Sequence, residues 1–88
     1  MRALECLAAV ALANGEHPLA AQLAREVVDL EPFRETGWQR LMRALAGGGN
    51  RAEAVRAYTQ CKKLLADELG VAPSPETEAI ARGLRRRG

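Results

Sequence analysis

Apolar residues recur at helical spacing along most of this 88-residue chain. Leu19, Leu23, Val27 and Leu30 follow one another at intervals of three or four residues, which places them on one face of an α-helix. Val, Ile and Thr together number nine, and no stretch alternates apolar and polar residues as a half-buried strand does. The pattern therefore predicts an all-α chain.

Glycine and proline divide this pattern into five predicted helices. They cover about residues 2–13, 18–31, 34–46, 50–69 and 74–86. Asn50 and Glu53 have the spacing of a capping box, in which each side chain bonds the backbone amide of the other residue. Gly70 is expected to close the fourth helix, because glycine adopts the left-handed conformation that follows a helix end.

The chain also resembles itself when it is shifted by 34 residues. The shift superimposes Leu7 on Leu41, Ala20 on Ala54, and the turn at Gly15 on the turn at Gly49. Thirty-four residues is the period of the tetratricopeptide repeat, a pair of antiparallel helices. The residues expected to form the framework of these repeats are Leu7, Ala20, Pro32, Trp38, Leu41, Ala54, Tyr58 and Gly70.

The fold prediction is a tetratricopeptide-like stack of two antiparallel helix pairs with a C-terminal capping helix. Repeat 1 covers about residues 2–31, repeat 2 about 34–69 and the cap about 74–86, all within one domain. Seventeen Ala and twelve Leu fit a thin core of closely packed helices. The predicted helix at residues 2–13 is apolar on nearly every side, and two repeats are fewer than the three or so that a stable stack needs. We therefore expect this helix to pack against a preceding repeat or another copy.

Composition excludes several classes of function. No segment has the roughly 18 uninterrupted apolar residues that a membrane span needs, so a cytoplasmic protein with no membrane contact is expected. Cys6 and Cys61 are too few for a disulfide framework or a zinc site and are predicted to be small apolar fillers. His17 is expected to be exposed, and it forms no catalytic triad with the single serine, Ser74. We predict no enzyme, no cofactor and no metal site.

The charge distribution leaves two alternatives open. Residues 1–31 carry two basic and five acidic side chains, whereas residues 34–63 carry seven basic and two acidic ones. One alternative is direct nucleic-acid binding through Arg40, Arg43 and Arg51. The other is a stand-alone self-association domain in which the first helix pairs with its copy.

Four motifs resemble those of a known family. They are LEPFRE at 30–35, LMRAL at 41–45, GNRAEA at 49–54 and LADELGVAPSPE at 65–76. In order and spacing they resemble the bacterial transcriptional activator domain of the antibiotic-regulatory-protein class of transcription factors. The resemblance implies the C-terminal part of a tetratricopeptide-like domain that normally follows a winged-helix DNA-binding domain, and this chain contains no candidate winged helix.

The function that the resemblance implies is a non-catalytic protein-interaction or oligomerisation module of a bacterial transcriptional regulator. The implied partners are its own winged-helix domain, another copy or the transcription machinery, with DNA contact at most indirect. We expect a detachable part of a regulator. Candidate partner contacts lie where such repeats usually line a concave groove: Arg2, Glu5, Thr36, Gln39 and Arg43.

Overall fold

Five helices make up the computed structural model, which describes the backbone of residues 2–85 and the side chains of residues 3–85. They are α1 (Arg2–Ala13), α2 (His17–Leu30), α3 (Glu35–Gly47), α4 (Arg51–Leu69) and α5 (Pro75–Arg85). No strand occurs in this part of the chain, which confirms the all-α prediction. Residue 86, the predicted end of the cap, lies outside the described residues.

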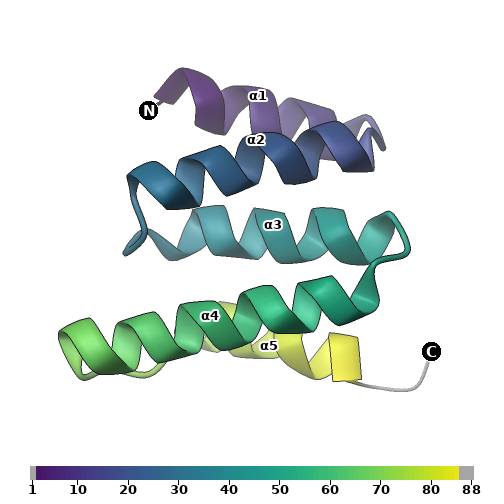
Figure 1. The fold of residues 1–88 in the computed structure, drawn as a ribbon. Helices are drawn as coiled ribbons and strands as arrows, with labels where there is room; N and C mark the ends of the chain where they lie inside the picture. The colour runs from purple at the N-terminus through teal and green to yellow at the C-terminus, as the bar shows by residue number, and fades with distance from the viewer. Residues whose placement is uncertain (1, 86–88) are drawn as a thin grey trace.

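The helices form a stack two layers thick. Each helix packs against the next along the chain, and α3 also contacts α1 and α5. Figure 1 shows α1 to α4 following one another from top to bottom, with α5 behind α4. The Cα extents of 34 × 34 × 18 Å match a slab with α1, α3 and α5 in one layer and α2 and α4 in the other. This is the predicted stack of helix pairs.

The 34-residue repeat extends to the way the first helix of each pair ends. Gly15 and Gly49 both have positive φ, at 76° and 90°. After each glycine, the next amide donates five residues back: Glu16 to the Ala11 carbonyl at 2.9 Å, and Asn50 to the Leu45 carbonyl at 2.8 Å. This is the Schellman closure, and it requires a residue that tolerates the left-handed conformation.

The predicted capping box at the start of α4 is wrong. Asn50 makes no side-chain cap hydrogen bond. Its amide, which Glu53 was expected to bind, already donates to the Leu45 carbonyl, and the Glu53 carboxylate pairs with Arg56 at 3.4 Å. The closure of α3 therefore uses the donor that the capping box needs.

The core lies mainly between α3, α4 and α5. Trp38, Leu41, Met42, Tyr58 and Leu65 are all buried there. The indole Nε1–H of Trp38 donates to the Pro32 carbonyl at 2.8 Å, which fixes the turn between α2 and α3.

Small side chains bring the helices close together. Ala20 and Ala54, which the 34-residue shift superimposes, are 2% and 0% exposed. A buried alanine at each site leaves room for the neighbouring helix, as ridges-into-grooves packing at 8–10 Å between axes requires.

Replacing Gly70 by alanine is expected to destabilise the fold by about 1–2 kcal/mol, because Gly70 closes α4 at φ 68°, where a Cβ is strained. No atom lies within 4 Å of the missing Cβ, so the whole cost is conformational. Gly83→Ala is the control: Gly83 lies within α5 with equally open surroundings, and alanine there should add about 0.5–1 kcal/mol. Urea unfolding of the two variants should shift in opposite directions, and shifts in the same direction would contradict this account.

Candidate protein-interaction surfaces

The structure uses two of the five predicted partner contacts within the chain itself. Gln39 donates through Nε2 to the Thr77 hydroxyl at 2.9 Å, and Glu5 accepts a hydrogen bond from Arg34. Thr36 and Arg43 are exposed on α3. The side chain of Arg2 lies outside the described residues. Glu5 and Gln39 thus have hydrogen-bond partners within the chain, and contact of the five residues with a partner stays a prediction.

Arg34 ties α1 to the turn between α2 and α3. Its guanidinium bonds Glu5 on α1 and also pairs with Glu31 at 3.3 Å. The hydrogen bond from Arg34 lowers the pKa of the half-buried Glu5 carboxyl. Both pairs are solvent-accessible, so they fix the orientation of the turn more than they add to stability.

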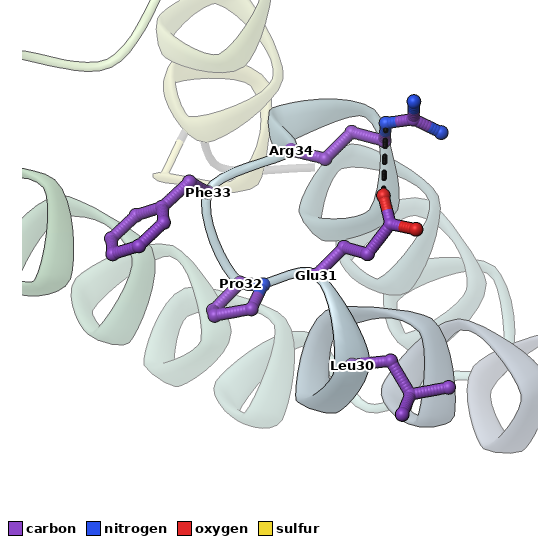
Figure 2. Close-up of a pocket in the computed structure, with 5 residues that line it drawn as sticks. All are labelled: Leu30, Glu31, Pro32, Phe33 and Arg34. Atoms are coloured by element: carbon purple, nitrogen blue, oxygen red, sulfur yellow. Dashed lines mark ion pairs between the residues drawn. The ribbon is translucent and has the colours of Figure 1, made fainter. Parts of the chain in front are cut away.

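The same turn carries a shallow hollow of about 530 Å³, lined by Leu30, Glu31, Pro32, Phe33 and Arg34. Figure 2 shows the Phe33 ring and the Leu30 side chain pointing away from each other, with the Glu31–Arg34 pair beside them. Leu30 is 57% exposed and Phe33 is 48% exposed. Because the hollow is lined by five consecutive residues, it is a dent in one turn, not a cleft between elements.

Polar contacts hold the start of α5 against α3. Oε1 of Glu35 accepts hydrogen bonds from the Ser74 amide at 2.9 Å and from the fully buried Thr77 hydroxyl at 2.6 Å. Burial alone would raise the pKa of Glu35, but the bonds from Thr77 and Ser74 outweigh it and lower that pKa. Farther along α5, Glu78 accepts the Tyr58 hydroxyl at 2.8 Å. No local signal in the sequence points to the Glu35 contacts, since the partners are 39 and 42 residues away.

The outer face of α5 is charged. Counting from the helix starts at residues 35 and 75, α5 repeats α3 at a shift of 40. Thr77, Ala81 and Leu84 then correspond to Gly37, Leu41 and Ala44, and all six are buried. The residues that correspond to the core-forming Trp38, Met42 and Leu45 are Glu78, Arg82 and Arg85. At the positions where α3 packs against α4, α5 therefore carries charged side chains. Two of them also contact α4, since Glu78 accepts the Tyr58 hydroxyl and the Arg85 guanidinium lies 5.3 Å from the centre of the Tyr58 ring.

The opposite end of the stack is apolar. Shifting back by 34 residues, Gly37, Leu41 and Ala44 correspond to Ala3, Leu7 and Val10, which we call the α1 face. On α3 these positions are buried, and Gly37 lies against Val27 and Val28 of α2. On α1 they are exposed, with Leu7 at 55% and Val10 at 56%.

Leu7, one of the predicted framework residues, is thus exposed within the described chain. The equivalent Leu41 is 0% exposed. The difference arises because α3 has α2 packed on this face, whereas α1 is the first helix of the described stack.

Several basic side chains of the middle segment have acidic neighbours. Arg56 pairs with Glu53 at 3.4 Å, and Lys63 pairs with Asp67 at 3.0 Å. Arg40 is half-buried, and its charge contributes to the lowered pKa of Glu5. These contacts reduce the positive charge that is free to meet phosphate groups.

Three sequence predictions concern reactive side chains. Cys61 is a buried filler, and burial raises the pKa of its thiol to about 12. Cys6 differs from its prediction because it is exposed on α1. His17 also differs: it is half-buried, and its imidazole occupies the space beside Gly47, which has no side chain.

Within residues 3–85, whose side chains are described, no group of three or more His, Cys, Asp or Glu residues is placed to hold a metal ion. Among the five described helices, none combines the length and apolar character of a membrane span.

The comparisons with known proteins agree with the motifs. The family model for the bacterial transcriptional activator domain matches residues 1–85. The transcriptional regulatory protein MoaR1 of Mycobacterium bovis is 34% identical over 74 residues, which are 84% of this chain and 24% of that protein. The regulatory protein AfsR of Streptomyces coelicolor is 38% identical over 69 residues, which are 78% of this chain and 7% of that protein. No solved structure matches significantly.

The chain spans about a quarter or less of the length of these relatives. The family match covers nearly all of it, and the fold has the helix-pair repeat that the resemblance implied. The chain belongs to the bacterial transcriptional activator domain family, and its relatives are transcriptional regulators.

Proposed function

We propose that this chain is a non-catalytic protein-interaction module of a cytoplasmic transcriptional regulator and that the α1 face is its contact surface. The observation that supports this most directly is the exposure of Leu7 and Val10 at positions whose repeat equivalents are buried. Removing apolar surface from water contributes about 25 cal/mol per Å², so a partner that covers this face is bound more favourably without any rearrangement of the helices.

The two ends of the stack support the same proposal. The charged outer face of α5 is suited to water, whereas the α1 face is suited to another apolar surface. The partner is the regulator's own DNA-binding domain, a second copy or the transcription machinery. We propose that DNA contact is indirect, which is supported by the ion pairs that Arg56 and Lys63 form with acidic neighbours.

Leu7→Lys is expected to reduce activation by the regulator at least about tenfold, because a charge in an apolar interface costs more than about 1.4 kcal/mol. The measurement uses a chimera in which this chain replaces the 69 matched residues of S. coelicolor AfsR, read out with an AfsR-dependent reporter. Leu69→Lys is the matched control, because Leu69 is 53% exposed on α4. Both substitutions should change stability by no more than about 0.5 kcal/mol.

Two outcomes would contradict the proposal. One is a chimera that folds but does not activate the reporter even without a substitution, or a chimera that activates the reporter as strongly with Leu7→Lys as without it. The other is binding of the purified chain to a 30-base-pair DNA duplex that weakens steeply with salt and is lost in the triple variant Arg40→Glu, Arg43→Glu, Arg51→Glu.

A further inference from the structure

The turn between α1 and α2 contains an asparagine followed by a glycine. Asn14 and Gly15 are both exposed, and so are Ala13 and Glu16 on either side. The space around Gly15 is open, since a Cβ built there would have no atom within 4 Å. The Asn14 side chain and the peptide bond that follows it are therefore accessible to water.

We infer that Asn14 is a site of spontaneous deamidation. The Gly15 backbone nitrogen loses its proton and attacks the side-chain carbonyl carbon of Asn14, which closes a succinimide ring and releases ammonia. Water then breaks one of the two bonds from the ring nitrogen to a carbonyl carbon. Breaking the bond to the side-chain carbon gives aspartate, and breaking the bond to the main-chain carbon gives isoaspartate. An amide and a water molecule become a carboxylate and an ammonium ion, without any oxidant or reductant.

The residue that follows each asparagine determines how easily the ring closes. Gly15 has no side chain to crowd the ring, and its amide donates to the Leu12 carbonyl at 3.1 Å in an exposed turn that local fraying opens. Asn50 is also exposed, but Arg51 follows it. The Arg51 side chain crowds the ring, and its nitrogen belongs to the first residue of the 19-residue helix α4. Asn14 should therefore react faster than Asn50.

The second repeat shows that the turn does not need this asparagine. The 34-residue shift aligns Asn14 with Gly48, which precedes the Schellman glycine of α3. Gly48 has φ −85° and ψ 5°, which residues with a side chain also adopt in turns. Glycine and asparagine thus both serve at this place, and only asparagine brings a reactive amide. The variant Asn14→Gly is expected to keep the fold.

Isoaspartate alters the main chain where α1 ends. It adds one carbon between residues 14 and 15, inside the loop that the Glu16 amide closes onto the Ala11 carbonyl at 2.9 Å. Its carboxylate also places negative charge beside the negative end of the helix dipole. Both changes loosen the packing of α1 on α2. The α1 face lies on the same helix, so ageing weakens the contact surface proposed above, although the modification itself does not rest on that proposal.

The test ages the purified, folded chain in mildly alkaline buffer. Trypsin separates the two asparagines, since it releases residues 3–25 and 44–51. Fragmentation mass spectrometry follows the conversion of each amide to an acid, and an isoaspartyl methyltransferase with labelled S-adenosylmethionine measures isoaspartate. Asn14 is expected to react at least about tenfold faster than Asn50, a barrier difference of about 1.4 kcal/mol. The control Asn14→Gly, aged in parallel, should accumulate no isoaspartate in residues 3–25.

Thermal unfolding of the aged chain tests the effect on α1. The isoaspartyl form, separated by ion exchange, should unfold at a midpoint at least about 5 °C lower than the fresh chain. Asn14→Asp, which adds the charge but keeps the main chain, should lower the midpoint less.

The inference is overturned if Asn14 reacts no faster than Asn50, if its acid product contains no isoaspartate, or if residues 3–25 of Asn14→Gly accumulate as much isoaspartate. An isoaspartyl form as stable as the fresh chain would overturn the loosening of α1. The reporter assay of Leu7→Lys uses none of these measurements, so the proposed function stands or falls separately.

Discussion

Replacing Trp38 by alanine is expected to destabilise the fold by about 3–5 kcal/mol. The side chain is 7% exposed and packs in the core between α3, α4 and α5, so truncation leaves a cavity as well as losing apolar burial. It also removes the donor to the Pro32 carbonyl. Domains are stable by only about 5–15 kcal/mol, so urea unfolding followed by far-ultraviolet circular dichroism should show a much lower midpoint.

Trp38→Phe separates the packing of the ring from the hydrogen bond that its Nε1–H makes. Phenylalanine keeps a ring in the core but has no Nε1–H, and the Pro32 carbonyl, in a half-buried turn, loses its partner. We expect most of the packing energy to remain, with the lost hydrogen bond costing about 1 kcal/mol. If Trp38→Ala itself costs less than about 1 kcal/mol, the ring does not fill the space between the helix pairs.

The arrangement of helices is predictable because its signals are local or periodic. Gly15 and Gly49 end the first helix of each pair in the same conformation, and the 34-residue shift aligns the start of α2 with the start of α4. A turn residue determines the backbone conformation only within a few positions of itself. A repeat is found by comparing the chain with its own sequence. Neither needs knowledge of which distant side chains meet.

The contacts between residues far apart in the sequence are less predictable. Glu5 bonds Arg34 from 29 positions away, and Gln39 bonds Thr77 from 38 positions away. Both residues were expected to face a partner, because the position on a helix face does not reveal whether a neighbouring helix offers a donor or acceptor. The capping box failed for a similar reason: its spacing was correct, but the Leu45 carbonyl had already engaged the amide.

Exposure is the other property that a repeat does not determine. Leu7 and Leu41 are the same residue at equivalent positions, and they are 55% and 0% exposed. The pattern shows which side of a helix is apolar, whereas burial depends on whether another helix lies beside it. The sequence therefore predicts that residues 2–13 pack against a preceding repeat or another copy, and the comparison of α1 with α3 adds which side chains, Leu7 and Val10, are exposed.

The second large effect is expected at Glu35, which fixes the start of α5. Glu35→Ala removes the acceptor of the Ser74 amide and of the buried Thr77 hydroxyl. Hydrogen bonds to a charged group contribute about 1.5–3 kcal/mol, and we expect a loss of that order at pH 7. Hydrogen exchange should show the amides of α5 opening first, because these contacts hold α5 to α3.

The effect of Glu35 should depend on pH. Its pKa in the fold lies below the ordinary value of 4.5, so its contribution is complete above pH 4.5 and is lost as the pH falls through the lower, folded value. Glu5 also has a lowered pKa, so the wild-type chain loses stability in acid for two reasons. Comparing the unfolding free energies of variants at pH 7 and pH 3 isolates the contribution of Glu35 to this loss of stability.

We therefore expect the difference in unfolding free energy between the wild type and Glu35→Ala to shrink markedly from pH 7 to pH 3. Glu53→Ala is the control, since Glu53 is exposed and pairs with the exposed Arg56, so its effect should stay within about 0.5 kcal/mol at both pH values. A Glu35→Ala deficit that is unchanged at pH 3 would show that the side chain acts through packing and not through its charge. In that case α5 would be held to the stack by the buried Ala81 and Leu84 and by the hydrogen bonds from Gln39 to Thr77 and from Tyr58 to Glu78.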